Sequence, residues 1–186
     1  LGRLFAMSTQ DPGQVAFRVN LLSVFAGAFT ALFTCWISMI LAFRTLEKEA
    51  FSAVEKKWGS IIAGVVAGLC CTFADSIWWN SVEAEVYALS SFFTAIVVWL
   101  MLKWQARTNQ PDHLNWIILI AYLMGLSIGV HLLNLLTLPA LGLIYYFHTY
   151  KFSWKGFFLT LFLSIIALLF IQYGIIQYSF HLIWLL

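Results

Sequence analysis

The chain has 186 residues, of which 62% are hydrophobic and only 10% are charged. Soluble domains have about 45–50% apolar and about 25% charged residues, so this composition excludes an ordinary soluble domain. It predicts an all-α polytopic transmembrane helix bundle, organised as a single transmembrane domain over residues 1–186. The net charge of +2 comes from basic residues in small, scattered groups, which argues against a nucleic-acid partner.

Six segments are apolar enough to form membrane-spanning helices, which need about 20 residues each to cross the hydrocarbon core. The first five cover residues 14–43, 58–73, 81–102, 113–130 and 134–147, and the last begins at residue 157. The last segment is long enough for one or one and a half spans. We therefore expect about six to seven spans in all.

Two glycine patterns predict how these segments pack and turn. Gly64 and Gly68 have the small-xxx-small spacing that lets another helix approach closely. Gly125 and Gly129, followed by His131, predict a tight or broken turn between the fourth and fifth segments. The three cysteines lie inside apolar segments, so we interpret them as small packing residues rather than disulfide partners or metal ligands.

The basic residues are distributed unevenly among the connections. Eight of the ten follow the first, third and fifth segments: Arg44, Lys48, Lys56, Lys57, Lys103, Arg107, Lys151 and Lys155. The positive-inside rule therefore places these connections in the cytoplasm. Residues 44–57 are predicted to form a cytoplasmic loop or a surface helix, and residues 74–85 an acidic loop on the outer side.

The outer loop carries Asp75, Glu83 and Glu85, which we treat as candidate catalytic acids. Glu83 has a structural alternative, because Asn80 and Glu83 have the spacing of a capping box at a helix start. Glu85 points to another side of the helix and cannot share that role, so we favour a functional role for it. Asp75 could equally be a solvated residue at a helix end.

Three further polar residues are predicted on the outer side. Arg18 in the first turns of the first span could extend to the lipid headgroups, or its forked guanidinium could bind a phosphate. His131 and Asn134 are three residues apart and would share one helical face. Their alternative role is hydrogen bonding inside the bundle.

Aromatic residues flank the acidic loop. Trp78, Trp79 and Tyr87 fit an aromatic belt at the membrane interface, and the two tryptophans could alternatively stack on a sugar. The sequence has no phosphate-binding glycine loop and no Gly-x-Ser-x-Gly motif, so a nucleotide donor is unsupported.

Four stretches of this sequence resemble one family of membrane proteins. They are Leu1-Gly-Arg-Leu-Phe, Val15-Ala-Phe-Arg18-Val-Asn-Leu-Leu-Ser, Glu83-Ala-Glu85-Val-Tyr87 and Tyr122-Leu-Met-Gly-Leu-Ser-Ile-Gly-Val-His131. Together they resemble the bacterial DUF2723 family, which is related to the protein O-mannosyltransferase TMEM260 and more distantly to the GT-C membrane glycosyltransferases. The resemblance covers about residues 1–152.

The resemblance implies a GT-C-like fold and transfer of a sugar from a polyprenyl-phosphate donor to an acceptor on the outer face. The acceptor could be a protein Ser or Thr. By matching the family motifs, Arg18 would hold the lipid phosphate, and Glu83, Glu85, Tyr87 and His131 would belong to the site. It also implies a bacterial inner-membrane location with the site facing the periplasm, membrane lipid as a partner, and no cofactor, while any metal requirement stays open.

The family's principal catalytic carboxylate lies in an outer loop between its first and second spans. That loop and the first span would precede Leu1, so we expect this chain to be a fragment that lacks them. Two rival interpretations remain. In one, the protein is a non-enzymatic membrane scaffold or assembly subunit whose outer acids only cap helices and contact solvent. In the other it is a secondary transporter, which would require inverted repeats and mid-membrane charges that the sequence does not show.

Overall fold

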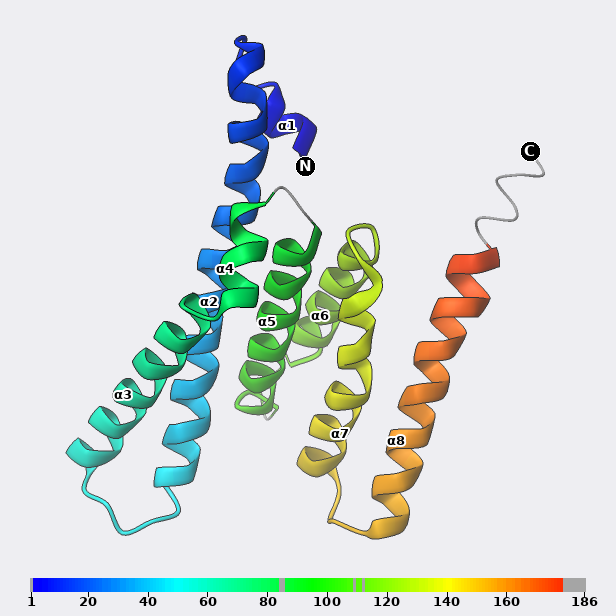
Figure 1. Cartoon of the computed structure of the whole chain (residues 1–186). Helices are drawn as coiled ribbons and strands as arrows, with labels where there is room; N and C mark the ends of the chain where they lie inside the picture. The colour runs from blue at the N-terminus through cyan, green and yellow to red at the C-terminus, as the bar shows by residue number, and fades with distance from the viewer. Residues whose placement is uncertain (1, 84–85, 109, 112, 179–186) are drawn as a thin grey trace. The chain divides into compact units, whose positions relative to one another are not determined.

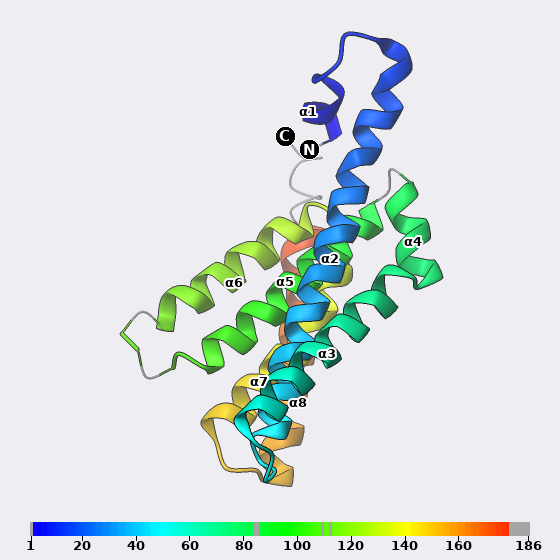
Figure 2. The same ribbon diagram turned by 90° about the vertical axis from the view of Figure 1, so that its left-hand side faces the viewer.

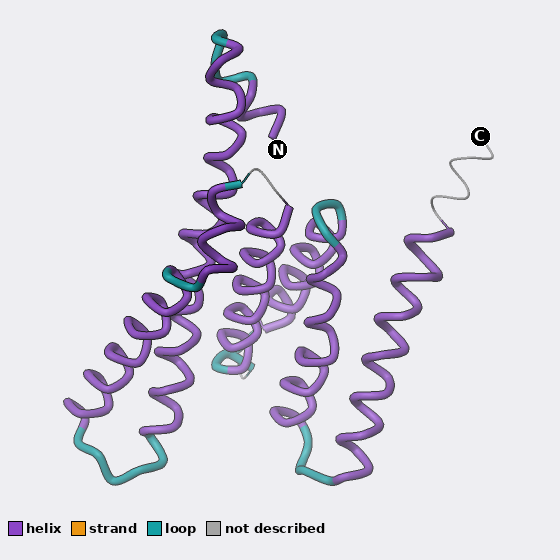
Figure 3. The backbone as a smooth tube through the Cα atoms, viewed as in Figure 1, coloured by secondary structure: helices purple, strands orange, loops and turns teal. Residues whose placement is uncertain are grey.

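The computed structural model describes residues 2–83, 86–108, 110–111 and 113–178. Every element in this part of the chain is helical, and no strand occurs among the described residues (Figure 3). The chain divides into two compact units, Leu1–His131 and Leu132–Leu186, and each is described by itself.

The first unit is organised along one long helix, α2 (Figures 1 and 2). Its helices are α1 (Gly2–Ala6), α2 (Val15–Leu46), α3 (Ala53–Thr72), α4 (Asp75–Val82), α5 (Val86–Gln105) and α6 (His113–Ile128). A short 3-10 turn, Pro12–Gln14, leads into α2, and the Asp11 side chain accepts a hydrogen bond from the Gly13 amide there. Helices α3, α4 and α5 all pack against α2.

The contact between α2 and α3 depends on glycine. A Cβ on Gly64 would collide with the Met39 side chain and lie 2.9 Å from the carbonyl oxygen of Cys35. A Cβ on Gly68 would lie 3.1 Å from the Cys35 Cβ. The predicted close approach at this small-xxx-small pattern is therefore confirmed.

The contact between α2 and α5 is aromatic. Phe33 of α2 lies with its ring centroid 5.9 Å from Phe92 and 5.3 Å from Trp99 of α5, and Trp36 lies 5.5 Å from Trp99. Edge-to-face and tilted ring pairs at these distances stabilise the contact in addition to the burial of apolar surface. Helix α5 also supplies most of the buried side chains of this unit, including the fully buried Val97.

The predicted outer loop is mostly helical, which corrects the expectation for residues 74–85. Residues Asp75–Val82 form α4, which is bent by 58° from α3. Asn80 lies inside α4 and Glu83 directly after it, so the predicted capping box at the start of the next span does not form. A helix satisfies its own backbone hydrogen bonds near the membrane, where a loop would leave them unpaired.

The second unit is a helical hairpin. It contains a 3-10 segment, η2 (Leu132–Thr137), then α7 (Leu138–Thr149), α8 (Trp154–Leu169) and a π-helical segment, η3 (Phe170–Ile176). Pro139 lies in the first turn of α7, where a missing amide proton is tolerated. The Tyr146 hydroxyl accepts a hydrogen bond from the Ser153 amide at 2.9 Å, which ties the end of α7 to the start of α8.

Four helical stretches are long and apolar enough to cross a membrane: Pro12–Leu46, Val86–Gln105, Leu132–Thr149 and Trp154–Ile176. A fifth arises if the bent pair α3 and α4 forms one span, whereas the apolar helix α6, with 16 residues, is shorter. The predicted all-α bundle is confirmed, and the protein is a multi-pass integral membrane protein. The count among the described residues is lower than the six to seven spans predicted.

Candidate functional site

The two ends of the first unit carry different side chains. The end of α2, the start of α3 and the end of α5 lie at one end (Figure 1), which we call the basic end. These helix ends and the connections next to them hold Arg44, Lys48, Lys56, Lys57, Lys103 and Arg107. The start of α2, the connection from α4 to α5 and the end of α6 lie toward the other end (Figure 1). Arg18, Glu83 and His131 belong to these last three places, and Tyr87 lies at the start of α5 next to them. We call this region the acidic end.

Arg18 is the cation of the acidic end that the sequence singled out. It lies in the first turns of α2 and is half-buried. Its Nε atom is buried and has no hydrogen-bond partner among the described residues. A buried guanidinium nitrogen without an acceptor is unfavourable, so this atom is suited to an anionic acceptor supplied from outside the described chain.

Asn20 connects the polar start of α2 to the acidic segment. Its Nδ2 donates a hydrogen bond to the carbonyl oxygen of Val82, the last residue of α4. Close packing of Gly27 against the Ser81 side chain brings the same two helices together, because a Cβ on Gly27 would collide with Ser81. Glu83 directly follows Val82, so its backbone is placed beside α2 near Asn20. Sequence reasoning did not identify this role of Asn20.

The two candidate acids that the structure describes, Asp75 and Glu83, lie at separate positions. Asp75 begins α4 and Glu83 directly follows it, and both side chains are exposed. Eight residues of α-helix separate them by about 12 Å along the axis. Glu85, the acid that we favoured, lies outside the described residues. Asp75 and Glu83 are thus candidates at separate positions rather than a pair acting on one atom.

Two predicted site residues from distant parts of the sequence meet. The rings of Tyr87, at the start of α5, and His131, after α6, have centroids 5.2 Å apart with planes tilted by 49°. The His131 amide donates to the Ser127 carbonyl at 2.8 Å, which continues the hydrogen bonding of α6 past Gly129 and fixes the backbone there. The predicted turn is confirmed at Gly129, where it directs His131 toward α5, whereas Gly125 lies inside α6 and does not interrupt it.

The remaining predicted residues have different surroundings. Asn134 is completely buried within the second unit, which favours the interpretation of hydrogen bonding inside the bundle over contact with a lipid phosphate. Trp78 and Trp79 of α4 are 56% and 64% exposed, so both remain available for the membrane interface or for a sugar. The described residues contain no group of three His, Cys, Asp or Glu side chains able to hold a metal ion.

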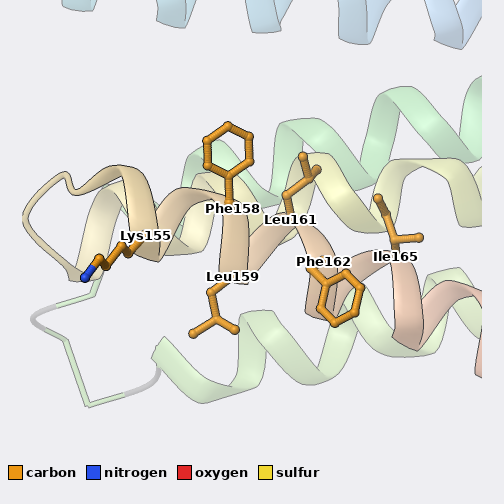
Figure 4. Close-up of a pocket in the computed structure, with 6 residues that line it drawn as sticks. All are labelled: Lys155, Phe158, Leu159, Leu161, Phe162 and Ile165. Carbon is orange, nitrogen blue, oxygen red and sulfur yellow. The ribbon is translucent and has the colours of Figure 1, made fainter.

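Two hollows in the described structure lie away from Arg18. One is at the basic end of the first unit, between α2, α3 and α5. The other is an open groove of about 600 Å³ along α8 in the second unit. Figure 4 shows Lys155 at one end of this groove, followed by a row of apolar side chains: Phe158, Leu159, Leu161, Phe162 and Ile165.

These observations define a class: a multi-pass, all-helical membrane protein with a half-buried, incompletely bonded arginine near an acidic segment at one end of its first unit. Comparison with protein families identifies the class more closely. Residues 1–154 match the family described as the protein O-mannosyl-transferase TMEM260 N-terminal domain, and the chain belongs to this family. Comparison with curated proteins and with solved structures gave no match.

Proposed function

We propose that this chain is the membrane module of a glycosyltransferase that moves a sugar, mannose by its family, from a polyprenyl-phosphate donor to a protein Ser or Thr hydroxyl. Membership of an O-mannosyl-transferase family supports the reaction class. The structural observation that carries the proposal is the buried Nε of Arg18 at the acidic end, which has no hydrogen-bond partner within the described ranges. The phosphate of the sugar donor requires a cation nearby. The Arg18 guanidinium supplies this charge and an N–H group that can bind a phosphate oxygen.

The length of α2 supports a position for Arg18 at headgroup depth. Its 32 residues extend about 48 Å, whereas the hydrocarbon core is about 30 Å thick. Twenty residues counted back from Arg44 end at Val24, so Arg18 lies about 9 Å beyond the hydrocarbon if Arg44 marks the opposite boundary. A lipid-linked phosphate diffusing in the bilayer would meet the guanidinium at this depth.

In this proposal, the acceptor hydroxyl attacks the anomeric carbon of the sugar. The bond from that carbon to the phosphate oxygen breaks, and the polyprenyl phosphate leaves with the electron pair. Arg18 stabilises the negative charge on the departing phosphate, which is usually the larger contribution to such catalysis. A carboxylate takes the hydroxyl proton. Among the acids of this chain, Glu85 is our first candidate, with Glu83 and Asp75 as alternatives.

The other predicted residues have supporting roles in this proposal. The Tyr87 and His131 pair would form part of the wall that receives the donor headgroup, because Tyr87 lies at the start of α5 and His131 follows the end of α6. Trp78 and Trp79 offer exposed faces for a sugar ring. The positive-inside rule favours the outer face for this end, which would be the periplasmic face in a bacterial inner membrane.

Arg18→Lys in the full-length protein tests the proposal. Lysine keeps the charge but loses the forked donor geometry, so transfer from polyprenyl-phosphate mannose should slow at least about tenfold, as expected from hydrogen bonds to charged groups of about 1.5–3 kcal/mol. Arg3→Lys is the matched control, because Arg3 is exposed on α1. Unchanged transfer by the Arg18 variant would remove Arg18 from the mechanism.

The second candidate function is a non-enzymatic membrane scaffold. The exposure of Asp75 and Glu83 at opposite ends of α4 favours it, because solvated acids need no catalytic role. A scaffold would tolerate Arg18→Lys and also Glu85→Gln without loss of transfer in cells. An enzyme that uses these residues would tolerate neither change.

A further inference from the structure

A second candidate site lies at the basic end of the first unit, opposite the acidic end. Here α2, α3 and α5 surround a hollow of about 400 Å³. This volume falls in the range of about 300–1,000 Å³ that is typical of small-molecule sites. Met39, Ile40, Phe43 and Leu102 provide apolar walls, and Arg44 and Lys103 provide positive charge.

Arg44 is held in place by the protein itself. Its Nη1 donates to the Gln105 side-chain oxygen at 2.6 Å, and its Nη2 donates to the Leu102 carbonyl at 2.9 Å, at the end of α5. A guanidinium has five N–H donors, so these two bonds leave others for a ligand. Because the side chain is already ordered, a ligand would bind it at a lower entropic cost.

The charges around the hollow favour an anion at its mouth. The connections at this end, residues 44–57 and 103–112, hold six basic and four acidic residues. Glu47 also lines the hollow and opposes an anion there. Glu55 is engaged by the amide and hydroxyl of Ser52 at the start of α3, where a carboxylate caps the helix.

We infer that this hollow binds an anionic phospholipid of the leaflet at the basic end. The lipid phosphate lies against Arg44 and Lys103, and the start of an acyl chain lies against Met39, Ile40 and Phe43. Basic hollows between transmembrane helices are suited to anionic headgroups, and the apolar walls continue toward the hydrocarbon along α2. This site is separate from the donor site proposed at Arg18, and its occupant is a resident lipid rather than a substrate.

Lys103→Gln tests the charge at this site without breaking the bonds that Arg44 makes to α5. The chain is purified in neutral detergent, and binding of short-chain phosphatidylglycerol is measured by native mass spectrometry. The variant should bind the lipid about fivefold more weakly, because one basic side chain near an anionic headgroup strengthens binding by about this factor. Lys48→Gln is the matched control: it removes the same charge from the same end, does not line the hollow, and should change binding by less than twofold.

Ala106→Trp tests the shape of the site. Ala106 is exposed at the rim, so the indole should fill the hollow with no change of charge and abolish binding. Thermal melting of each variant establishes that it is folded. The inference is overturned if the two lysine variants lose lipid binding equally, or if Ala106→Trp binds the lipid normally. It is also overturned if phosphatidylcholine binds as well as phosphatidylglycerol, or if inorganic phosphate at equal concentration displaces the lipid.

Discussion

Arg18 and Arg44 lie near opposite ends of the same helix, α2, and the protein surrounds them differently. Arg44 donates to Gln105 and to the Leu102 carbonyl, so the chain itself supplies its acceptors. Arg18 keeps a buried Nε with no partner in the described part of the chain. Arg44 thus has a structural role in addition to the lipid contact inferred above, whereas Arg18 has a candidate role in binding the sugar donor.

The difference extends to the neighbouring helices. At the basic end, Arg44 lies at the C-terminus of α5, where a cation compensates the negative end of the helix dipole. At the acidic end, Asn20 bonds across to α4, while its own Oδ1 is buried without a hydrogen-bond partner in the described part of the chain. Of the two arginines, Arg44 is therefore the better satisfied. Incomplete hydrogen bonding at the acidic end is what a site open to a polar ligand would show.

Arg44→Gln should reveal this difference with the largest effect on stability. The variant weakens two hydrogen bonds from a charged group, which typically contribute about 1.5–3 kcal/mol each. We expect a clearly lowered free energy of unfolding in detergent, with normal transfer per folded molecule. Arg18→Lys should show the opposite pattern, with normal unfolding and slow transfer. Equal loss of stability in both variants would contradict the separation of roles.

Gly64→Leu should disturb both ends together, because α3 joins the basic connection to α4. The new side chain would press on Met39 and on the Cys35 backbone, and overpacking of this kind costs about 1–3 kcal/mol. The free energy of unfolding is the quantity to measure. Gly125→Ala in α6 is the control, since a Cβ there meets no atom within 4 Å. A stable Gly64→Leu protein would show that the α2 and α3 contact is looser than described.

Asn20→Ala should have the smallest effect and act at the acidic end alone. It removes the hydrogen bond to Val82, and side-chain hydrogen bonds within membranes average about 0.6 kcal/mol. We expect a small loss of stability and a faster amide hydrogen exchange confined to the end of α4. If the variant changed amide exchange near Gln105 at the basic end instead, this local role of Asn20 would be contradicted.

Parts of both the fold and the site could be predicted because local composition decides them. Apolar segments separated by charged connections predicted the helices, and Gly64 and Gly68 predicted a close helix contact that the structure confirms. Helix α4 was missed because Asp75 and Glu83 are typical of a polar loop, while packing of Ser81 on Gly27 depends on a helix far away in the sequence. The pairing of Tyr87 with His131 had no local signal for the same reason.

The sequence by itself determined that this is a helical membrane protein with its basic residues gathered in alternate connections, because burial in lipid demands long apolar helices and charge is excluded from them. It also determined which polar residues stand near the span ends. Only the tertiary structure decided that Arg44 is bonded to α5, while the Nε of Arg18 has no acceptor among the residues that the structure describes. The hydrogen-bond acceptors belong to other helices, and helix packing, which no single segment encodes, determines whether they lie close enough to bond.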